Sequence, residues 1–521
     1  MWGWRSSRTV VVGLGAALFV VSCVLPVAAF LTTSLDGATA AFALDARQRR
    51  LLVNTASLGV GAAVWATATG APLGLLLARG SLPDKALLRI ALAARLLLPP
   101  YVVALAWTYL ATSRGLLATV AGNDALAAWA YSLPAAVLVL GLVLYPLSML
   151  ATEVAIRRID GRLEEAALMV AGPADVFWRI TVPLAAPGII ATALVIFVLA
   201  VSEFGVPGVL RVRVYTTEIF TAFAALYDPG RAALLALPLL TLCLAVAVVS
   251  VVLLGDRFIS ARRSADTPGA LRVEGSRPLF VMMAVVLVTA LALPIAVLAR
   301  EALGSQSIVA VVEGSGEAIA NSLRLATLGA SAVVGIAMWL GYARARTTSR
   351  AGRLADVGLV VLFAVPGTLI GVGLIHVWNR PGPLGALYGT DGMLVLAYLA
   401  RLLPIAVLAL AASGRAVPVS HEEAAATSGA GWLRTMWRIV VPQMRLGLVA
   451  AWLITFVLAF GELGVSILVA PPGETTLPIR IYTIVANAPS SSVAVLALLQ
   501  AGIILGPLAV LAAVLAHRDM S

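Results

Sequence analysis

The chain has 521 residues, of which 61% are hydrophobic and only 12% are charged. A soluble domain carries about a quarter charged residues, so this composition excludes an ordinary soluble protein and indicates a polytopic membrane protein. The net charge is +11, but the arginines lie in short segments between long apolar runs. This pattern speaks against nucleic acid as a partner and favours a lipid bilayer with the basic segments on the cytoplasmic side.

Apolar runs of about 20 residues predict membrane-spanning helices, because a backbone in lipid must satisfy its hydrogen bonds internally. We expect an all-α fold of about twelve such spans in two tandem six-helix repeats. In the first half the predicted spans lie near 9–31, 53–78, 88–112, 130–152, 186–209 and 232–254. In the second half they lie near 279–300, 322–343, 357–378, 393–413, 447–470 and 493–516. An even number of spans places both termini on one side, and the arginines predict that this side is cytoplasmic.

The two halves are internal repeats joined by a polar segment. We expect the first repeat at residues 1–255, a cytoplasmic linker at 256–277 and the second repeat at 278–521. Arg79 and Arg346 occupy matching positions in the two repeats, 267 residues apart. Both copies should face the same way, as a parallel repeat about an axis along the membrane normal.

The loop after the fourth predicted span carries the same phrase in both halves, within 153–185 and 414–446. Two glutamates and two alanines come first, and Trp-Arg-Ile-x-Val-Pro then leads to the next span. A short helix is predicted at each phrase, with Asp160 and Ser420 as N-caps and the acidic pair in the first turn. Glycines in the left-handed conformation can end such helices. A capped helix of this kind fits a partner's groove, whereas without a partner it would be an interfacial connector.

These segments resemble the EAA motif of binding-protein-dependent ABC importer permeases, whose pattern runs E-A-A, then G, then I-x-L-P. The second copy fits through Glu423-Ala424-Ala425, Gly429, Ile439 and Val441-Pro442. In the first copy Gly172 comes one residue late, and the distance from glutamate to proline is one residue shorter. The resemblance covers nearly the whole chain and implies the type I importer permease fold. It also implies that the ATPase is contacted by Glu164, Glu165, Ala166, Ala167 and Gly172, and by Glu422, Glu423, Ala424, Ala425 and Gly429.

The resemblance further implies a transport subunit of the bacterial inner membrane. Its implied partners are two copies of an ABC ATPase subunit and an extracytoplasmic substrate-binding protein. The single lysine of the chain, Lys85, does not lie in a glycine-rich phosphate-binding turn. We therefore expect ATP hydrolysis by the separate partner, and no catalytic residue, metal site or cofactor in this chain.

Two glutamates occupy equivalent positions near the far ends of the fifth and eleventh spans, Glu203 and Glu462. A charge in the membrane is costly, so each should face a cavity or a cation. Gly205 and Gly464 follow two residues later and would permit a break in the helix. Arg401 lies in the tenth span and could pair with one of the glutamates. These residues are candidates for a pathway lining or gate, and the alternative is a structural ion pair between helices.

The substrate is the open point of this interpretation. The phrases Ser202-Glu203-Phe204-Gly205-Val206-Pro207 and Thr216-Thr217-Glu218-Ile219 are similar to segments of ferric-iron permeases. Thiamine, phosphonate and polyamine importers share much of this architecture. A six-plus-six secondary carrier is the rival class, but it would not need a twinned acidic helix. A membrane-embedded enzyme would need clustered polar groups on facing spans, and the sequence shows only scattered ones.

Overall fold

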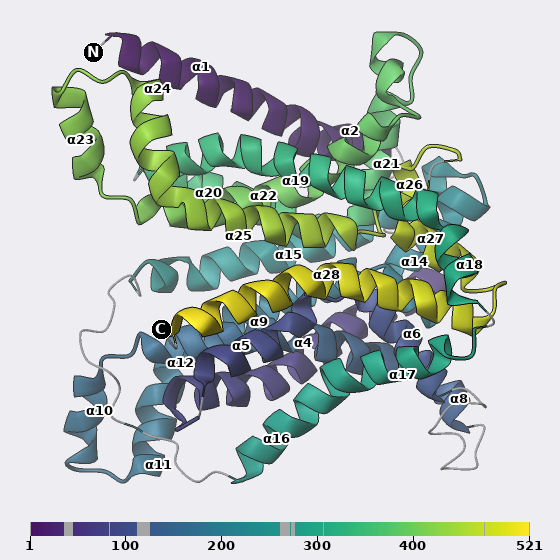
Figure 1. Cartoon of the computed structure of the whole chain (residues 1–521), viewed down its shortest axis with the longest axis horizontal. Coiled ribbons are helices and arrows are strands. Elements are labelled where there is room, and N and C mark those ends of the chain that lie inside the picture. The colour runs from purple at the N-terminus through teal and green to yellow at the C-terminus, as the bar shows by residue number, and fades with distance from the viewer. Residues whose placement is uncertain are drawn as a thin grey trace. The chain divides into compact units, whose positions relative to one another are not determined.

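The computed structural model describes residues 2–35, 45–82, 84–111, 125–260, 271, 277–305, 307–347, 349–473 and 475–519. Helices dominate these residues and no strand occurs among them, which confirms the predicted all-α polytopic fold (Figure 1). Most of the predicted linker, residues 261–270 and 272–276, lies outside the described residues. The chain forms two compact units, which are described separately.

The first unit comprises Met1–Ala43, Ile219–Leu240 and Ser315–Arg480. Its helices are α1 (Trp2–Phe19), α2 (Leu25–Leu35), α19 (Gly316–Ala345), α20 (Arg350–Ala364), α21 (Gly367–Trp378), α22 (Asp391–Arg415), α23 (Val419–Thr427), α24 (Trp432–Thr435), α25 (Val441–Phe460) and α26 (Ser466–Val469). Helix α19 packs along α22 and α25, and the N-terminal helices α1 and α2 pack against α19 and α21. The first helix of the chain therefore covers the core of the second sequence repeat.

The second unit comprises Leu44–Glu218, Thr241–Gly314 and Ile481–Ser521. Its helices are α4 (Ala46–Arg79), α5 (Lys85–Ala94), α6 (Pro100–Ala111), α8 (Ala125–Ala130), α9 (Leu133–Arg157), α10 (Gly161–Leu168), α11 (Pro173–Val176), α12 (Val182–Ser202), α13 (Gly205–Val209), α16 (Arg277–Leu287), α17 (Leu293–Ala302), α18 (Ile308–Glu313) and α28 (Ser490–Asp519). Helices α14 (Tyr215–Phe220), α15 (Pro229–Ser260) and α27 (Leu477–Ile484) have residues in both units.

In the second unit, α4 packs along α9 and α12, while α16 and α17 pack against α4 and α6. Helices α16 and α17 open the second sequence repeat, so each repeat places its first helix on the core of the other. For this reason the compact units do not coincide with the predicted sequence repeats. The repeat boundaries themselves stay a prediction, since they are boundaries of sequence similarity and not of packing.

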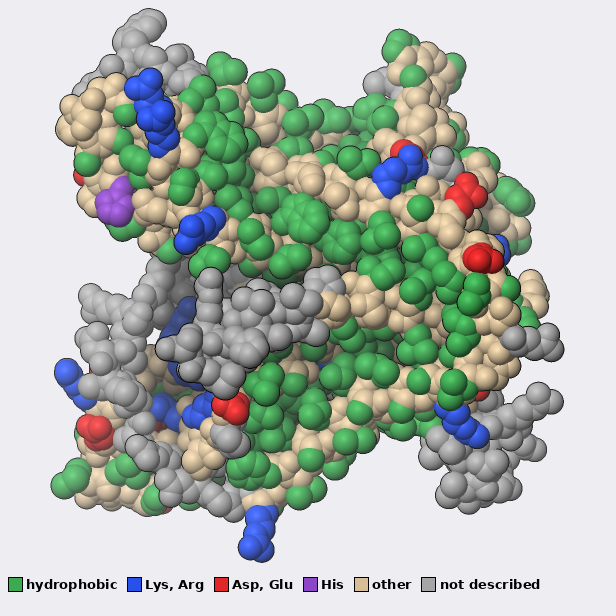
Figure 2. Space-filling view, in the orientation of Figure 1, with side chains coloured by type: hydrophobic (Ala, Val, Ile, Leu, Met, Phe, Trp, Pro, Cys, Tyr) green, Lys and Arg blue, Asp and Glu red, His purple; other side chains and the backbone are tan. Residues whose placement is uncertain are grey.

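Each predicted span falls on an apolar helix. Counted over the described residues, nine helices are long and apolar enough to cross a membrane, and two bent helix pairs bring the number to eleven. The described part of α28, Ser490–Gly506, supplies a further apolar helix where the twelfth span was predicted. Figure 2 shows hydrophobic side chains over the middle of the helices and charged ones toward their ends. Large apolar side chains such as Val64 and Leu328 are exposed there, as expected of a surface that faces lipid.

The fifth and eleventh spans begin earlier than predicted, at Pro173 and Trp432, and end at Ser202 and Phe460. The Trp-Arg-Ile-x-Val-Pro segments already belong to these helices. A proline inside a helix removes an N–H group and clashes with the carbonyl four residues before it. Here a π-helical turn ends two residues before each proline, at Phe177–Thr181 and Met436–Val440, and the wider turn lets the helix continue.

The third and ninth spans are bent instead of straight. The axes of α5 and α6 meet at 88°, and those of α20 and α21 at 93°. The chain breaks at Pro99 and Pro366, the two positions related by the offset of 267. Since a proline disfavours helical geometry in the residue before it, Leu98 and Val365 are extended and the helix stops there.

Glycines allow the second and fourth helices of each repeat to touch backbone to backbone. A Cβ atom at Gly70 would lie 2.4 Å from the carbonyl oxygen of Tyr145, and one at Gly74 would lie 2.3 Å from that of Met149. Gly341 meets Leu410 and Ala411 of α22 in the same way. Small residues spaced four apart are typical of close helix contacts in membranes.

Replacing Gly74 by a large residue tests the close packing of α4 on α9. Gly74→Leu should lower the free energy of unfolding by about 3 kcal/mol, because its side chain would overlap the α9 backbone, which cannot move aside. Thermal unfolding of the purified protein in detergent measures the loss. Gly335→Ala on α19 is the control, since no atom lies within 4 Å of its added Cβ. Equal stability of the Gly74→Leu protein and wild type would contradict the close packing of α4 on α9.

Candidate functional site

The first repeated phrase forms α10, as predicted. The Asp160 carboxylate is the N-cap and accepts a hydrogen bond from the Arg162 amide at 3.1 Å. The two glutamates then face opposite ways: the Glu164 side chain is fully buried, whereas Glu165 and Ala166 are exposed. Only the second glutamate of the pair is therefore presented to a partner.

Residues from three separate parts of the chain hold the buried carboxylate of Glu164. Arg79, at the end of α4, lies 3.2 Å from its Oε1 atom, and the Thr181 hydroxyl donates to the same atom at 2.9 Å. The amide of Leu271 donates to Oε2 at 3.2 Å. Arg79 also donates to the carbonyl of Ile156 at the end of α9. The carboxylate thus joins α10 to the ends of two membrane helices.

The second phrase forms α23, but its start differs from the prediction. The N-cap is Pro418 and makes no side-chain capping bond, so the capping box expected at Ser420 is wrong. Pro418 has φ −61° and ψ 131°, and the helix begins at the next residue, Val419. The orientation of the acidic pair is nevertheless the same as in α10: Glu422 is buried, while Glu423 and Ala424 are exposed.

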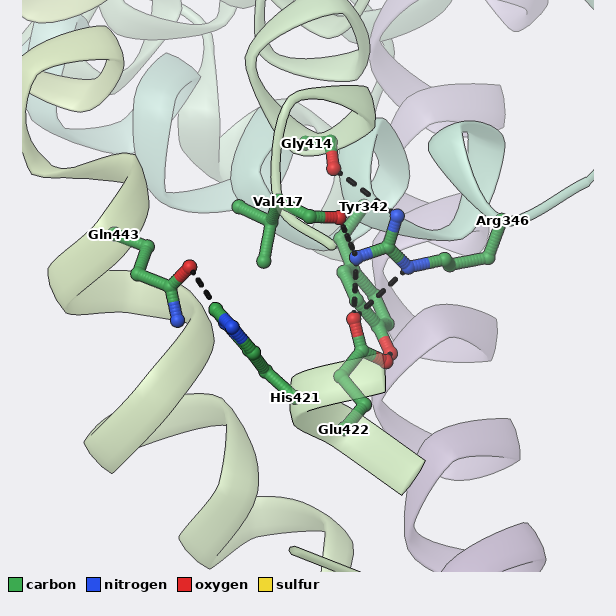
Figure 3. A network of polar contacts seen from close by, with 7 residues as sticks. All are labelled: Tyr342, Arg346, Gly414, Val417, His421, Glu422 and Gln443. Atoms are coloured by element: carbon green, nitrogen blue, oxygen red, sulfur yellow. Dashed lines mark hydrogen bonds and ion pairs between the residues drawn. The ribbon is translucent and has the colours of Figure 1, made fainter. Parts of the chain in front are cut away.

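Arg346 fills the role of Arg79 in this second copy (Figure 3). Its Nε atom donates to Oε1 of Glu422 at 2.9 Å, and its Nη2 atom forms an ion pair with the same oxygen. The guanidinium also donates to the carbonyl of Gly414, in the last turn of α22, and to that of Val417, just after the helix. The Tyr342 hydroxyl donates to the other carboxylate oxygen, Oε2, at 2.6 Å.

The same buried pair therefore occurs twice, at Arg79–Glu164 and Arg346–Glu422. The carbonyl acceptors Ile156 and Gly414 also correspond between the repeats, whereas the hydroxyl comes from Thr181 in one copy and Tyr342 in the other. A buried ion pair is no more stabilising than well-packed apolar residues. Its occurrence in both copies thus points to the fixed position of α10 and α23 as the property that is maintained.

The two phrase glycines behave differently. Gly429 has φ +77° and follows α23 in the left-handed conformation, as predicted. Gly172 has φ −72° and is the N-cap of α11, a role that Gly431 has before α24 in the second copy. The left-handed helix end expected at Gly172 is therefore wrong: three residues separate Gly172 from the end of α10, whereas one residue separates Gly429 from the end of α23.

The exposed surfaces of the two loops also differ. After α10, Met169 and Val170 are 85% and 88% exposed. The equivalent residues of the second loop are the exposed polar pair Thr427 and Ser428. The two loops thus share an exposed acidic residue but offer partners an apolar corner in one copy and a polar corner in the other.

Glu203 and Glu462 lie where the fifth and eleventh spans break. The Glu203 carboxylate accepts a hydrogen bond from the Gly205 amide at 2.9 Å, and that of Glu462 accepts from the Val465 amide at 3.0 Å. Each carboxylate therefore binds a backbone amide at the start of the short helix that follows the break. Gly205 begins α13 and Gly464 lies in the turn before α26, so the predicted helix break is observed at both positions. Whether these residues line a pathway stays a prediction.

Arg401 binds backbone instead of a carboxylate in the described part of the chain. It donates to the carbonyl of Val365 at 2.6 Å and lies over the ring of Phe363. In the other repeat Arg95 donates to the carbonyl of Leu98 at the equivalent bend. Each arginine thus satisfies a carbonyl that the proline break leaves without a helical partner.

Sequence reasoning missed the partners of the buried glutamates. Arg79 and Arg346 were recognised as matched positions, but not as part of the site. Their constant offset was the available signal, together with the 100° angle between neighbouring residues on a helix, which prevents Glu164 and Glu165 from facing one partner together. Tyr342 and Thr181 had no such signal, because they occupy unequal positions in the repeats.

Comparison with known proteins adds the family context. Residues 70–250 and 333–518 match the family model for the binding-protein-dependent transport system inner membrane component. The Fe(3+)-transport system permease protein FbpB 2 of Haemophilus influenzae is 24% identical over 447 residues, which cover 84% of each chain. The ferric transport system permease protein FbpB of Actinobacillus pleuropneumoniae is 23% identical over 64% of this chain and 51% of its own length. The molybdenum transport system permease protein ModB of Escherichia coli K12 is 36% identical over 25% of this chain and 57% of its own length.

Proposed function

Since the chain belongs to the family of binding-protein-dependent transport inner membrane components, we propose that α10 and α23 are its two coupling helices, each seating one copy of a separate ATPase subunit. The observation that carries this proposal is the twin geometry. In both loops the first glutamate is buried against an arginine, and the second is exposed beside a small alanine. Such a helix is held in place by its buried side, and its exposed side carries a small and an acidic residue. It is therefore suited to a groove in a partner protein.

The surrounding partners and the orientation are part of the same proposal. The loops that contain α10 and α23 carry Arg162, Arg179, Arg434 and Arg438, and basic loops stay cytoplasmic. Both termini then lie in the cytoplasm of a bacterium, and the protein crosses its inner membrane. A binding protein outside the membrane delivers the substrate, and closure of the ATPases switches the pathway between inward and outward access.

Ferric iron is the proposed substrate. Support comes from the two ferric permeases, of which one matches 84% of this chain. The match to a molybdenum permease is shorter and covers a quarter of the chain. Among the described residues no group of three or more metal-binding side chains is present. The proposal assigns selectivity for iron to the binding protein that delivers it.

The test is reconstitution with the ATPase and binding protein from neighbouring genes. We expect the ATPase to co-elute with this chain, and the complex to take radioactive ferric iron into vesicles only when ATP and the binding protein are present. Thiamine, phosphonate, putrescine and molybdate, offered in parallel, should not be transported. Uptake driven by a proton or sodium gradient without the ATPase would overturn the proposal in favour of a secondary carrier.

A further inference from the structure

Helices α4 and α19 are hydrogen-bonded to other elements at both of their ends. At one end lies the inner tie, the buried pair Arg79–Glu164 or Arg346–Glu422. At the other end a hydroxyl accepts a hydrogen bond from a backbone amide, which we call the far tie. In the first repeat the Tyr215 amide donates to the Thr55 hydroxyl at 3.1 Å, and in the second the Leu477 amide donates to the Ser322 hydroxyl at 2.6 Å.

The far tie is buried in both copies. The side chains of Thr55 and Ser322 are 0% and 2% exposed, and Tyr215 and Leu477 are fully buried as well. The donating and accepting residues differ between the repeats, yet in both a backbone amide donates to a hydroxyl near the start of the long helix. An amide that loses its acceptor in such a place is left without water to replace it.

The two ties are separated by the same length of helix. From 55 to 79 and from 322 to 346 the chain advances by 24 positions, which corresponds to about 36 Å of α-helix. Helix α4 runs as one helix through Ala46–Arg79, with Pro72 inside it, and α19 runs through Gly316–Ala345 with Arg346 as its C-cap. A continuous helix transmits a displacement from one end to the other.

The elements attached by the far ties follow the broken spans. Tyr215 begins α14 and Leu477 begins α27. In the first repeat the Thr216 hydroxyl also donates to the carbonyl of Glu203, at the break after α12. The far tie therefore connects α4 with α14, and α14 in turn is bonded to the predicted gate residue Glu203.

We propose that α4 and α19 are the rods that carry movement of the ATPase-bound coupling helices to the segments after the broken spans. The inference rests on the proposed function, since it needs a motor docked at α10 and α23. The buried glutamate makes each coupling helix move together with the inner end of its rod. The far tie makes α14 and α27 follow the other end.

The experiment removes the far ties and leaves the coupling loops intact. Thr55→Val and Ser322→Ala are combined in one chain, which is reconstituted with its ATPase and binding protein. The double variant should bind the ATPase as wild type does, while uptake falls about tenfold because each freed amide loses its acceptor. Thr69→Ala is the matched control, because within the described residues its hydroxyl bonds to the Trp65 carbonyl of the same helix and to no other element.

A reporter cysteine detects movement of the segment after α27 separately from ATP hydrolysis by the partner. Ala486→Cys places an exposed thiol after α27, and the native Cys23 and Cys243 are buried. In the Ala486→Cys protein, nucleotide should change the rate of maleimide labelling, and in the far-tie variant that change should disappear. An unaltered nucleotide effect and wild-type uptake in the double variant would overturn the inference.

The conservative pair Thr55→Ser and Ser322→Thr tests whether misfolding, and not loss of the hydroxyls, causes the fall in uptake. It retains both hydroxyls, so wild-type uptake and labelling are expected. Loss of uptake in this folded pair would also overturn the inference, because the hydroxyl acceptor would not be the cause. If wild-type chain fails to bind the ATPase, the proposed function fails and the inference fails with it. If wild type binds the ATPase and transports iron, and the far-tie variant does so equally well, the inference fails while the proposed function stands.

Discussion

Arg346→Ala is expected to lower the free energy of unfolding by about 3–5 kcal/mol, the usual cost of leaving one charge of a buried pair without its partner. The Glu422 side chain is only 7% exposed and would keep only the Tyr342 hydroxyl among its observed side-chain partners. Two carbonyls, of Gly414 and Val417, would lose a donor as well. Thermal unfolding in detergent, together with the folded yield from membranes, measures the effect.

Two further variants identify the cause of the lower stability of Arg346→Ala. Arg434→Ala removes an exposed arginine from the same loop and should change stability by less than about 0.5 kcal/mol. Arg346→Met combined with Glu422→Met removes both charges and should recover most of the loss, since apolar residues can replace a buried ion pair. If the double methionine variant were as unstable as Arg346→Ala, the unpaired charge would not be the reason.

The membrane helices could be predicted from sequence because long apolar runs have few alternatives to a helix in lipid. The bends at Pro99 and Pro366 were not predicted, although both prolines were visible. A hydropathy pattern counts apolar residues and does not distinguish a straight span from two half-spans. The crossing of α1 and α16–α17 onto the opposite repeat could not be predicted either, because it depends on packing between segments far apart in the chain.

At the candidate site the sequence predicted the twin helices and their acidic pairs, but not the division of roles within each pair. The composition of the Glu164–Glu165 pair is symmetric, and only the packing of α10 shows which carboxylate is buried. Arg401 illustrates the opposite error. A charge in a span suggested a carboxylate partner, whereas the proline bend nearby supplies unsatisfied carbonyls that an arginine can bind equally well.

If α10 and α23 each seat an ATPase subunit, as proposed, the apolar corner of the first loop predicts that the two loops bind it unequally. Met169→Asp combined with Val170→Asp should weaken ATPase binding by about 2–4 kcal/mol, the range for central apolar contacts of an interface. Both side chains are more than four-fifths exposed in this chain, so the substitutions disturb no internal packing. Co-elution of the ATPase at graded concentrations measures the change.

The second loop supplies the matched control, because Thr427 and Ser428 occupy the equivalent positions and are polar already. Thr427→Asp with Ser428→Asp adds the same charge but removes no apolar contact, so its effect on binding should be much smaller. Ala174→Asp adds one charge to the first loop beyond the apolar corner and should behave likewise. Equal losses in all three variants would show that negative charge, and not apolar contact, weakens docking. A larger loss in the Met169→Asp, Val170→Asp variant than in the other two would show that the two loops bind identical ATPase copies with different affinity. The first loop would then bind its copy through Met169 and Val170.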